Sequence, residues 1–128
     1  MIVNGARIIS SEPLQCIPAQ FINTHAGITP RYRGSHGAYW SLCNGDPVND
    51  GVTVHLIDHG TDTGGVLYQA RSDVTNSDNF TTYPTLQICA GIILLERSIN
   101  DILAGNERVV TIASESKLWY PPTLCAYL

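Results

Sequence analysis

The stretch Phe21-Ile-Asn-Thr-His-Ala-Gly-Ile-Thr-Pro-Arg-Tyr-Arg-Gly34 is the most informative part of this chain. It begins within a short apolar run, residues 20–23, that predicts a β-strand, and a loop rich in Gly and Pro follows. Asn23 and His25 are two residues apart, so on an extended backbone their side chains leave the same face and can converge on one small group. The carboxyl end of a strand in an open α/β sheet is also where such folds bind ligands.

The residues before this stretch predict a βαβ unit. Residues 1–3 form a short apolar run that ends at Asn4-Gly5, and Ser10-Ser-Glu-Pro13 is typical of the start of a short helix. Two strands that flank a helix in this way are expected to lie side by side in one sheet.

The residues after it predict a helix, two strands and a long helix. Residues 38–43 form a helix that should stop at Asn44-Gly45, and residues 51–57 and 65–71 alternate as strands do. The loop between these strands, residues 58–64, predicts that they are antiparallel neighbours. Apolar residues at helical spacing predict a helix over residues 83–104 that ends at Gly105, and residues 109–112 predict a further strand. The pattern favours an α/β fold with a mixed sheet and flanking helices.

Composition predicts a single domain, residues 1–128, with one core, since the chain has 128 residues and 44% of them are hydrophobic. The net charge of −4 argues against a sequence-independent grip on nucleic acid, which needs clustered Lys and Arg. No apolar stretch is long enough to cross a bilayer, and the first residues lack the pattern of a secretory signal, so we expect no membrane partner and a cytoplasmic location.

The cysteines and histidines do not follow the spacing of metal ligands, so no metal is expected. The four cysteines stand far apart in sequence and are expected to be buried free thiols.

Four motifs in one order identify a resemblance: Asn23-Thr-His25, Pro30-Arg-Tyr-Arg-Gly34, Gly51-Val-Thr53 and Asp62-Thr-Gly64. The chain resembles the folate-dependent formyltransferases, a family that includes methionyl-tRNA, glycinamide ribonucleotide and sugar N-formyltransferases. The resemblance implies the C-terminal part of a Rossmann-like formyltransferase domain. It also implies transfer of a formyl group from 10-formyltetrahydrofolate to a primary amine of a small substrate, for example an amino sugar nucleotide.

By this resemblance the catalytic residues are Asn23, His25 and Asp62. The resemblance also implies that Arg7, Ile8 and Ile9, together with the loop residues His59, Gly60 and Thr61, border the pocket for the pterin of the formyl donor.

The chemistry of the reaction agrees with these residue types. Attack of an amine on a formyl carbon builds negative charge on the formyl oxygen and positive charge on the amine, so a site needs hydrogen-bond donors and a proton acceptor. His25 and the Asn23 amide can donate. Asp62 can accept the proton, and we expect it to hold His25 in the charged, donating form.

The chain departs from the family pattern in its length before Asn23. Relatives have a longer Rossmann-like half there, so residues 1–4 or 20–23 are expected to form an uncovered sheet edge. Three outcomes follow: the chain is a fragment or a naturally shortened gene product, it pairs with itself or another chain, or it is a degenerate homologue that binds without turnover. We favour a homodimer or a missing partner chain that covers the edge. The basic module of tRNA-acting relatives is not expected, which argues against a tRNA acceptor. Hydrolysis of formyltetrahydrofolate, or a non-catalytic role in folate binding or assembly, remain alternatives.

Overall fold

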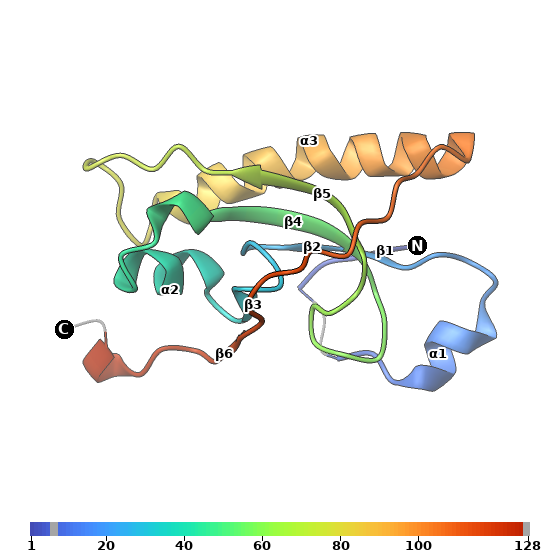
Figure 1. The fold of residues 1–128 in the computed structure, drawn as a ribbon, viewed down its shortest axis with the longest axis horizontal. Coiled ribbons are helices and arrows are strands. Elements are labelled where there is room, and N and C mark those ends of the chain that lie inside the picture. Colours follow the sequence, from blue (N-terminus) through green and yellow to red (C-terminus); the bar gives the residue numbers. More distant parts are fainter. Residues whose placement is uncertain (6–7, 127–128) are drawn as a thin grey trace.

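The computed structural model describes residues 1–5 and 8–126, which form a mixed sheet with helices beside it (Figure 1). The main sheet has the strand order β1-β2-β4-β5, made of β1 (Ile2–Val3), β2 (Ile22–His25), β4 (Gly51–Leu56) and β5 (Val66–Arg71). β1 and β2 are parallel and flank helix α1 (Ser11–Cys16), whereas β4 is antiparallel to both β2 and β5. The predicted α/β class, the βαβ unit and the antiparallel pair are therefore confirmed.

Helix α3 (Tyr83–Ala104) covers one face of this sheet (Figure 1). Its bounds agree with the prediction, because Gly105 adopts the left-handed conformation, φ 67°, that ends a helix at low steric cost. The core between helix and sheet joins buried strand residues to one side of α3: Ile22, Val54, Leu67, Leu94, Leu95, Ile99 and Ile102. None of the helices within residues 1–5 and 8–126 has the length and apolar character of a membrane-spanning segment.

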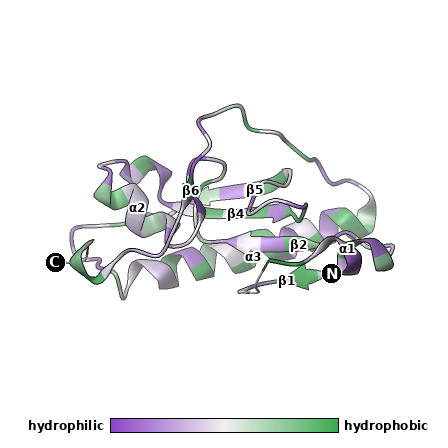
Figure 2. Ribbon diagram, turned by 90° about the horizontal axis from the view of Figure 1, so that it is seen from below, coloured by the Kyte–Doolittle hydropathy of each residue, from purple (hydrophilic) through white to green (hydrophobic). Residues whose placement is uncertain are grey.

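The opposite face of the sheet carries the shorter elements (Figure 2). They are β3 (Arg33–Gly34), α2 (Gly37–Cys43), the 3₁₀ turns η1 (Pro47–Asn49) and η2 (Leu124–Ala126), and β6 (Leu118–Trp119). Helix α2 ends before Asn44-Gly45, as predicted. The parallel pair β3–β6 was not predicted, because two residues per strand are too few to show a sequence period.

Two predictions were wrong. Residues 109–112 do not form a strand: Val110 makes one isolated bridge to Val66 of β5, and both Val109 and Val110 remain about half exposed. The cysteines are free, but all four are exposed rather than buried: Cys16, Cys43, Cys89 and Cys125. Cysteine is usually buried, but here the element that carries the residue decides its exposure. Cys16, for example, lies on helix α1, which buries none of its residues.

A buried carboxylate joins the start of β4 to α3. Asp50 is fully buried, and its Oδ1 accepts a hydrogen bond of 3.0 Å from Gln87, whose amide also donates to the Gly51 carbonyl at 2.6 Å. The second carboxylate oxygen of Asp50 has no partner among the described residues. Burial raises the pKa of Asp50 from 3.8 to about 6, although the Gly51 amide acts in the opposite direction.

This carboxylate makes stability depend on pH. A group whose folded pKa is raised stabilises the protein at low pH, and that contribution is lost as pH rises through the folded value, here about 6. We expect Asp50→Asn to gain stability relative to the wild type between pH 4 and pH 7, in urea unfolding. Asp73→Asn, which removes the same charge from an exposed position, should show no such trend. A stability difference for Asp50→Asn that is constant over this range would contradict the assignment.

Candidate active site

The register between β2 and β4 sets two side chains of the site opposite each other. Asn23 pairs with His55 across the antiparallel ladder, and His25 pairs with Thr53. The Asn23 amide nitrogen lies 3.2 Å from Nε2 of His55. Nδ1 of His55 lies 2.7 Å from the Leu56 carbonyl, which can only accept, so Nδ1 carries a proton. Nε2 is therefore the ring nitrogen of His55 that faces the Asn23 amide.

Thr53 holds the loop that follows His25 against the sheet. Its hydroxyl donates to the Gly27 carbonyl at 2.7 Å and accepts from the Thr29 amide at 3.1 Å. Thr53 is fully buried, so these bonds form away from water. The Gly-Val-Thr motif of β4 thereby fixes the path of the chain just after Asn23 and His25.

His25 is buried, and both of its ring nitrogens face acceptors. Nε2 lies 2.7 Å from the Tyr32 carbonyl, and Nδ1 lies 3.3 Å from Oδ2 of Asp62. The side chain of His25 is 7% exposed. Because a carbonyl oxygen can only accept, Nε2 carries a proton and Nδ1 is the nitrogen that faces the carboxylate.

Asp62 is the residue on which the site converges. It lies in the β4–β5 loop, and its carboxylate accepts from the Gly34 amide at 2.9 Å and from the Asn23 amide at 3.3 Å. Nε2 of His55 lies 3.4 Å from the same carboxylate. The structure therefore brings together Asn23, His25 and Asp62, as the sequence predicted, and adds His55.

Burial decides the charge state of His25. It lowers the pKa of His25 below 6.5, although the Asp62 carboxylate and the Tyr32 carbonyl oppose that shift. Burial also acts to raise the pKa of Asp62, but His55, His25 and the Gly34 amide together hold that pKa below 3.8. The expectation that Asp62 keeps His25 charged is therefore corrected: near neutral pH an ionised Asp62 faces a neutral His25.

Sequence reasoning missed His55, which lies on the predicted strand of residues 51–57 and received no role there. Its side chain is 3% exposed, as packing requires, yet its ring contacts two residues of the site, Asn23 and Asp62. The available signal was the register: a strand that pairs antiparallel with β2 must place one residue opposite Asn23. The sequence did not specify which residue that is.

A pocket of about 900 Å³ surrounds these side chains. Of the residues that the resemblance assigned to the folate pocket, Ile8, Ile9, Gly60 and Thr61 line it. Arg7 lies outside the described residues. His59 is not part of the lining, and its Nδ1 instead lies 3.2 Å from the Ser11 hydroxyl, on the exposed side of α1.

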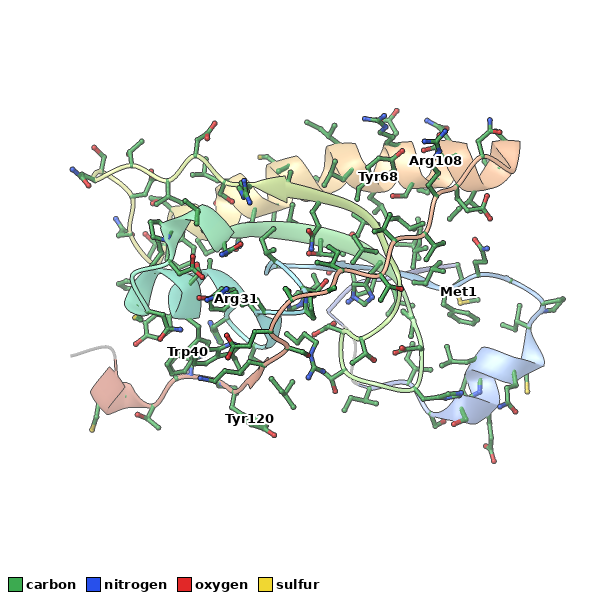
Figure 3. The ribbon with its side chains drawn as sticks, in the orientation of Figure 1. Met1, Arg31, Trp40, Tyr68, Arg108 and Tyr120 are labelled. Carbon is green, nitrogen blue, oxygen red and sulfur yellow. The ribbon has the colours of Figure 1, made fainter. Side chains whose placement is uncertain are left out.

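The other wall of the pocket comes from segments that the sequence analysis did not assign to the site. Gly34, Ser35 and His36 form one part of it, and residues 118–120 form another. Figure 3 shows Trp40 beside the C-terminal segment, to which Tyr120 belongs, and the indole of Trp40 donates to the Tyr120 carbonyl at 2.9 Å. Among residues 1–5 and 8–126 no group of three or more His, Cys, Asp or Glu side chains is placed to hold a metal ion.

Comparison with known proteins gives consistent results. Residues 1–86 match the family model described as formyl transferase. Methionyl-tRNA formyltransferase of Thermodesulfovibrio yellowstonii is 32% identical over 105 residues, which are 82% of this chain and 34% of the relative. Methionyl-tRNA formyltransferase of Synechocystis sp. is 29% identical over 97% of this chain and 37% of the relative.

The fold is also that of a solved formyltransferase. The formyltransferase PseJ from Anoxybacillus kamchatkensis, in complex with UDP-4,6-dideoxy-4-formamido-L-AltNAc and tetrahydrofolate, superposes with a TM-score of 0.81 at 24% identity. The match covers 92% of this chain and 62% of PseJ. The chain thus corresponds to part of a Rossmann-like formyltransferase domain.

The chain spans about a third of the length of the two curated relatives. The family model nevertheless matches well over half of the chain, and the Thermodesulfovibrio relative exceeds 30% identity over most of it. On these grounds the chain belongs to the formyl transferase family.

Proposed function

We propose that this chain carries the catalytic centre of an enzyme that transfers a formyl group from 10-formyltetrahydrofolate to a primary amine. The observation that carries the proposal is the meeting of Asn23, His25 and Asp62, from two separate segments, in one pocket. The amine nitrogen forms a bond to the formyl carbon, the bond from that carbon to the folate nitrogen breaks, and the folate nitrogen takes up a proton.

In this proposal the N–H of the Asn23 amide that donates to Asp62 in the structure turns to the formyl oxygen as negative charge develops there, while the amide nitrogen stays beside His55. The His25–Asp62 pair accepts the proton that the attacking amine loses. An ionised carboxylate beside the unprotonated Nδ1 of a neutral imidazole, 3.3 Å away, suits that task, because the incoming proton can lie between the two groups. His55 orients Asn23 through its Nε2. Neutral His25 thereby becomes part of the proton acceptor instead of an oxyanion donor.

The pocket suits a folate-sized donor. Its volume of about 900 Å³ lies in the range of small-molecule sites, and apolar side chains line one end of it: Val3, Ile8, Ile9 and Ile57. A flat pterin ring can bury its faces against such side chains, while backbone groups of residues 58–61 can pair with its polar edge. PseJ, the solved neighbour, was crystallised with tetrahydrofolate, which supports the same donor here.

The acceptor is proposed as a small amine, for example an amino sugar nucleotide. Two findings support different classes of acceptor. The curated relatives are methionyl-tRNA formyltransferases, whereas PseJ was solved with a formamido sugar nucleotide. The net charge of −4 favours the small acceptor over a tRNA backbone. A panel of acceptors must therefore include amino sugar nucleotides, glycinamide ribonucleotide and methionyl-tRNA.

The proposed function predicts the effects of changing two of the catalytic side chains, Asn23 and Asp62. Asn23→Ala should lower kcat on the order of 100- to 1000-fold, as loss of an oxyanion donor does. Asp62→Asn should lower it by about 100-fold or more, through loss of the proton acceptor. Release of tetrahydrofolate and formation of the formyl amide are the measurements, and the controls are Asn76→Ala and Asp73→Asn at exposed positions.

The outcome of this assay separates the alternatives. Formyl transfer that survives in both site variants would falsify the assignment. Folate release without any acceptor would indicate hydrolysis of the donor. Folate binding without turnover, with every acceptor in the panel, would indicate a binding or assembly module.

The second prediction concerns pH. The proposed working form has His25 neutral, and burial lowers the pKa of His25 below 6.5, so His25 gains a proton only as pH falls through that lowered value. We expect kcat/KM, corrected for the fraction of unprotonated amine, to stay level from pH 8 to pH 6.5 and to decline at lower pH. A rate that increases as pH falls below 6.5 would instead show that charged His25 is the working form.

A third proposal concerns the partner at the sheet edge. β1 is the outermost strand on its side of the sheet, and Met1 and Ile2 are 55% and 51% exposed. An edge of this kind invites pairing with another chain, so we propose that a second copy or a separate partner chain covers it. Ile2→Lys should weaken self-association by placing a charge at the edge.

Light scattering measures this directly. We expect a mass of about twice the 13.9 kDa of the chain for a homodimer, reduced toward the monomer value in Ile2→Lys. A monomer mass, combined with free hydrogen exchange of the β1 amides that do not face β2, would contradict pairing at this edge.

A further inference from the structure

The side chain of Arg33 joins two segments that are far apart in sequence. Its Nη1 donates to the Thr61 carbonyl in the β4–β5 loop at 2.8 Å, and its Nε donates to the Ser116 hydroxyl at 3.0 Å. Thr61 immediately precedes Asp62. The guanidinium thus ties the backbone of the loop that carries the carboxylate to the C-terminal segment.

The residue after Arg33 holds the same loop at the next position. The Gly34 amide donates to Oδ2 of Asp62 at 2.9 Å. The Arg33 side chain therefore contacts the backbone of Thr61, and the Gly34 backbone contacts the side chain of Asp62. Two consecutive contacts fix both the position of the loop and the direction of the carboxylate.

Asp62 needs such support because of its backbone conformation. Its φ of 51° lies in the left-handed region, which side-chain-bearing residues adopt at a cost, so contacts outside the loop must maintain it. Without them, the carboxylate that lies 3.3 Å from both Asn23 and His25 would be free to move.

The C-terminal segment in turn fixes Arg33. Strand β6 pairs with β3 through bonds from the Arg33 amide to the Lys117 carbonyl and from the Ser35 amide to the Trp119 carbonyl, 3.1 and 3.0 Å. The ring of Trp119 stacks on Tyr32 and on Trp40, with centroids 5.8 and 4.8 Å apart. This support lies outside residues 1–86, the part that matches the family model.

We propose that Arg33 is a positioning residue that fixes Asp62, and that residues 116–119 serve catalysis by holding Arg33 in place. The proposal rests on the proposed function for its kinetic consequences, but the geometry it asserts can be measured without turnover. It differs from a role in substrate binding, because Nη1 and Nε of Arg33 are both used within the protein.

The kinetic experiment compares Arg33→Met, Arg33→Lys and Arg31→Met. Arg31→Met is the matched control, since it removes the same charge from the same loop. The Arg31 side chain lies near α2 (Figure 3), where its Nε is 3.0 Å from Oδ2 of Asp46, and it does not hold the β4–β5 loop. We expect Arg33→Met to lower kcat roughly 10- to 100-fold, as a small misplacement of a catalytic group does, with KM for the folate within about twofold of the wild type. Arg33→Lys, which can make only one of the two bonds, should be intermediate.

The second experiment reads the position of Asp62 through His25. Because the Asp62 carboxylate acts to raise the pKa of His25, its displacement should let that pKa fall further. Ring ¹⁵N titration by NMR should therefore show a lower His25 pKa in Arg33→Met than in the wild type. Arg31→Met should leave it unchanged.

These readouts separate the two proposals. A wild type without turnover for any acceptor, but with the predicted change in His25 titration, would overturn the proposed function and leave Arg33 as the residue that fixes Asp62. Unchanged kcat, or a His25 titration in folded Arg33→Met equal to that in Arg31→Met, would overturn the positioning role.

If Arg33→Met does not fold, Ser116→Ala tests the same proposal in a folded protein. This variant removes a single hydrogen bond at an exposed position, so the fold should survive. We expect kcat to fall roughly 2- to 10-fold and the His25 pKa to fall, in the direction expected for Arg33→Met. A Ser116→Ala enzyme identical to the wild type in both measurements would contradict the role of the C-terminal segment.

Discussion

The contacts of one carboxylate, that of Asp62, connect the parts of this structure. Donors and rings from the end of β2, from β3 and from β4 reach it, and each comes from a different segment of the chain. A carboxylate away from bulk water is stable in its charged form only where such groups surround it. The charged form of Asp62 is therefore stable only when these segments meet around it.

Order in the site depends on the antiparallel register between β2 and β4. Asn23 lies opposite His55, and a shift of β2 by one residue relative to β4 would turn the Asn23 side chain to the helix-covered face, away from His55. The buried contact of Asp50 with Gln87, at the start of β4, restrains that register from the far end of the strand. Strand β4 thus links the packing of α3 on one face of the sheet to the site residues on the other face.

The sequence specified local structure well and long-range contacts less well. The bounds of α3 followed from helical spacing and from Gly105, and the side-by-side placement of Asn23 and His25 followed from the period of a strand. The role of His55 and the pairing of β3 with β6 could not be predicted, because both depend on which residues meet across the sheet. The charge of His25 was predicted wrongly, since sequence shows a nearby Asp62 but not the extent of burial.

Burial and charge have opposite effects at this site, and their balance gives it a chemical use. If solvent reached His25, its attraction to Asp62 would keep a proton on Nδ1, and the pair could not accept another. Because the effect of burial on the pKa of His25 is larger than that of Asp62, His25 is neutral and Nδ1 is unprotonated near neutral pH. The groups that contact Asp62 keep its pKa low, so the carboxylate also stays unprotonated. A proton acceptor of this kind requires a well-fixed geometry, because the two groups compete for a proton over a gap of 3.3 Å. That requirement explains why so many backbone and side-chain bonds are directed at a single loop residue.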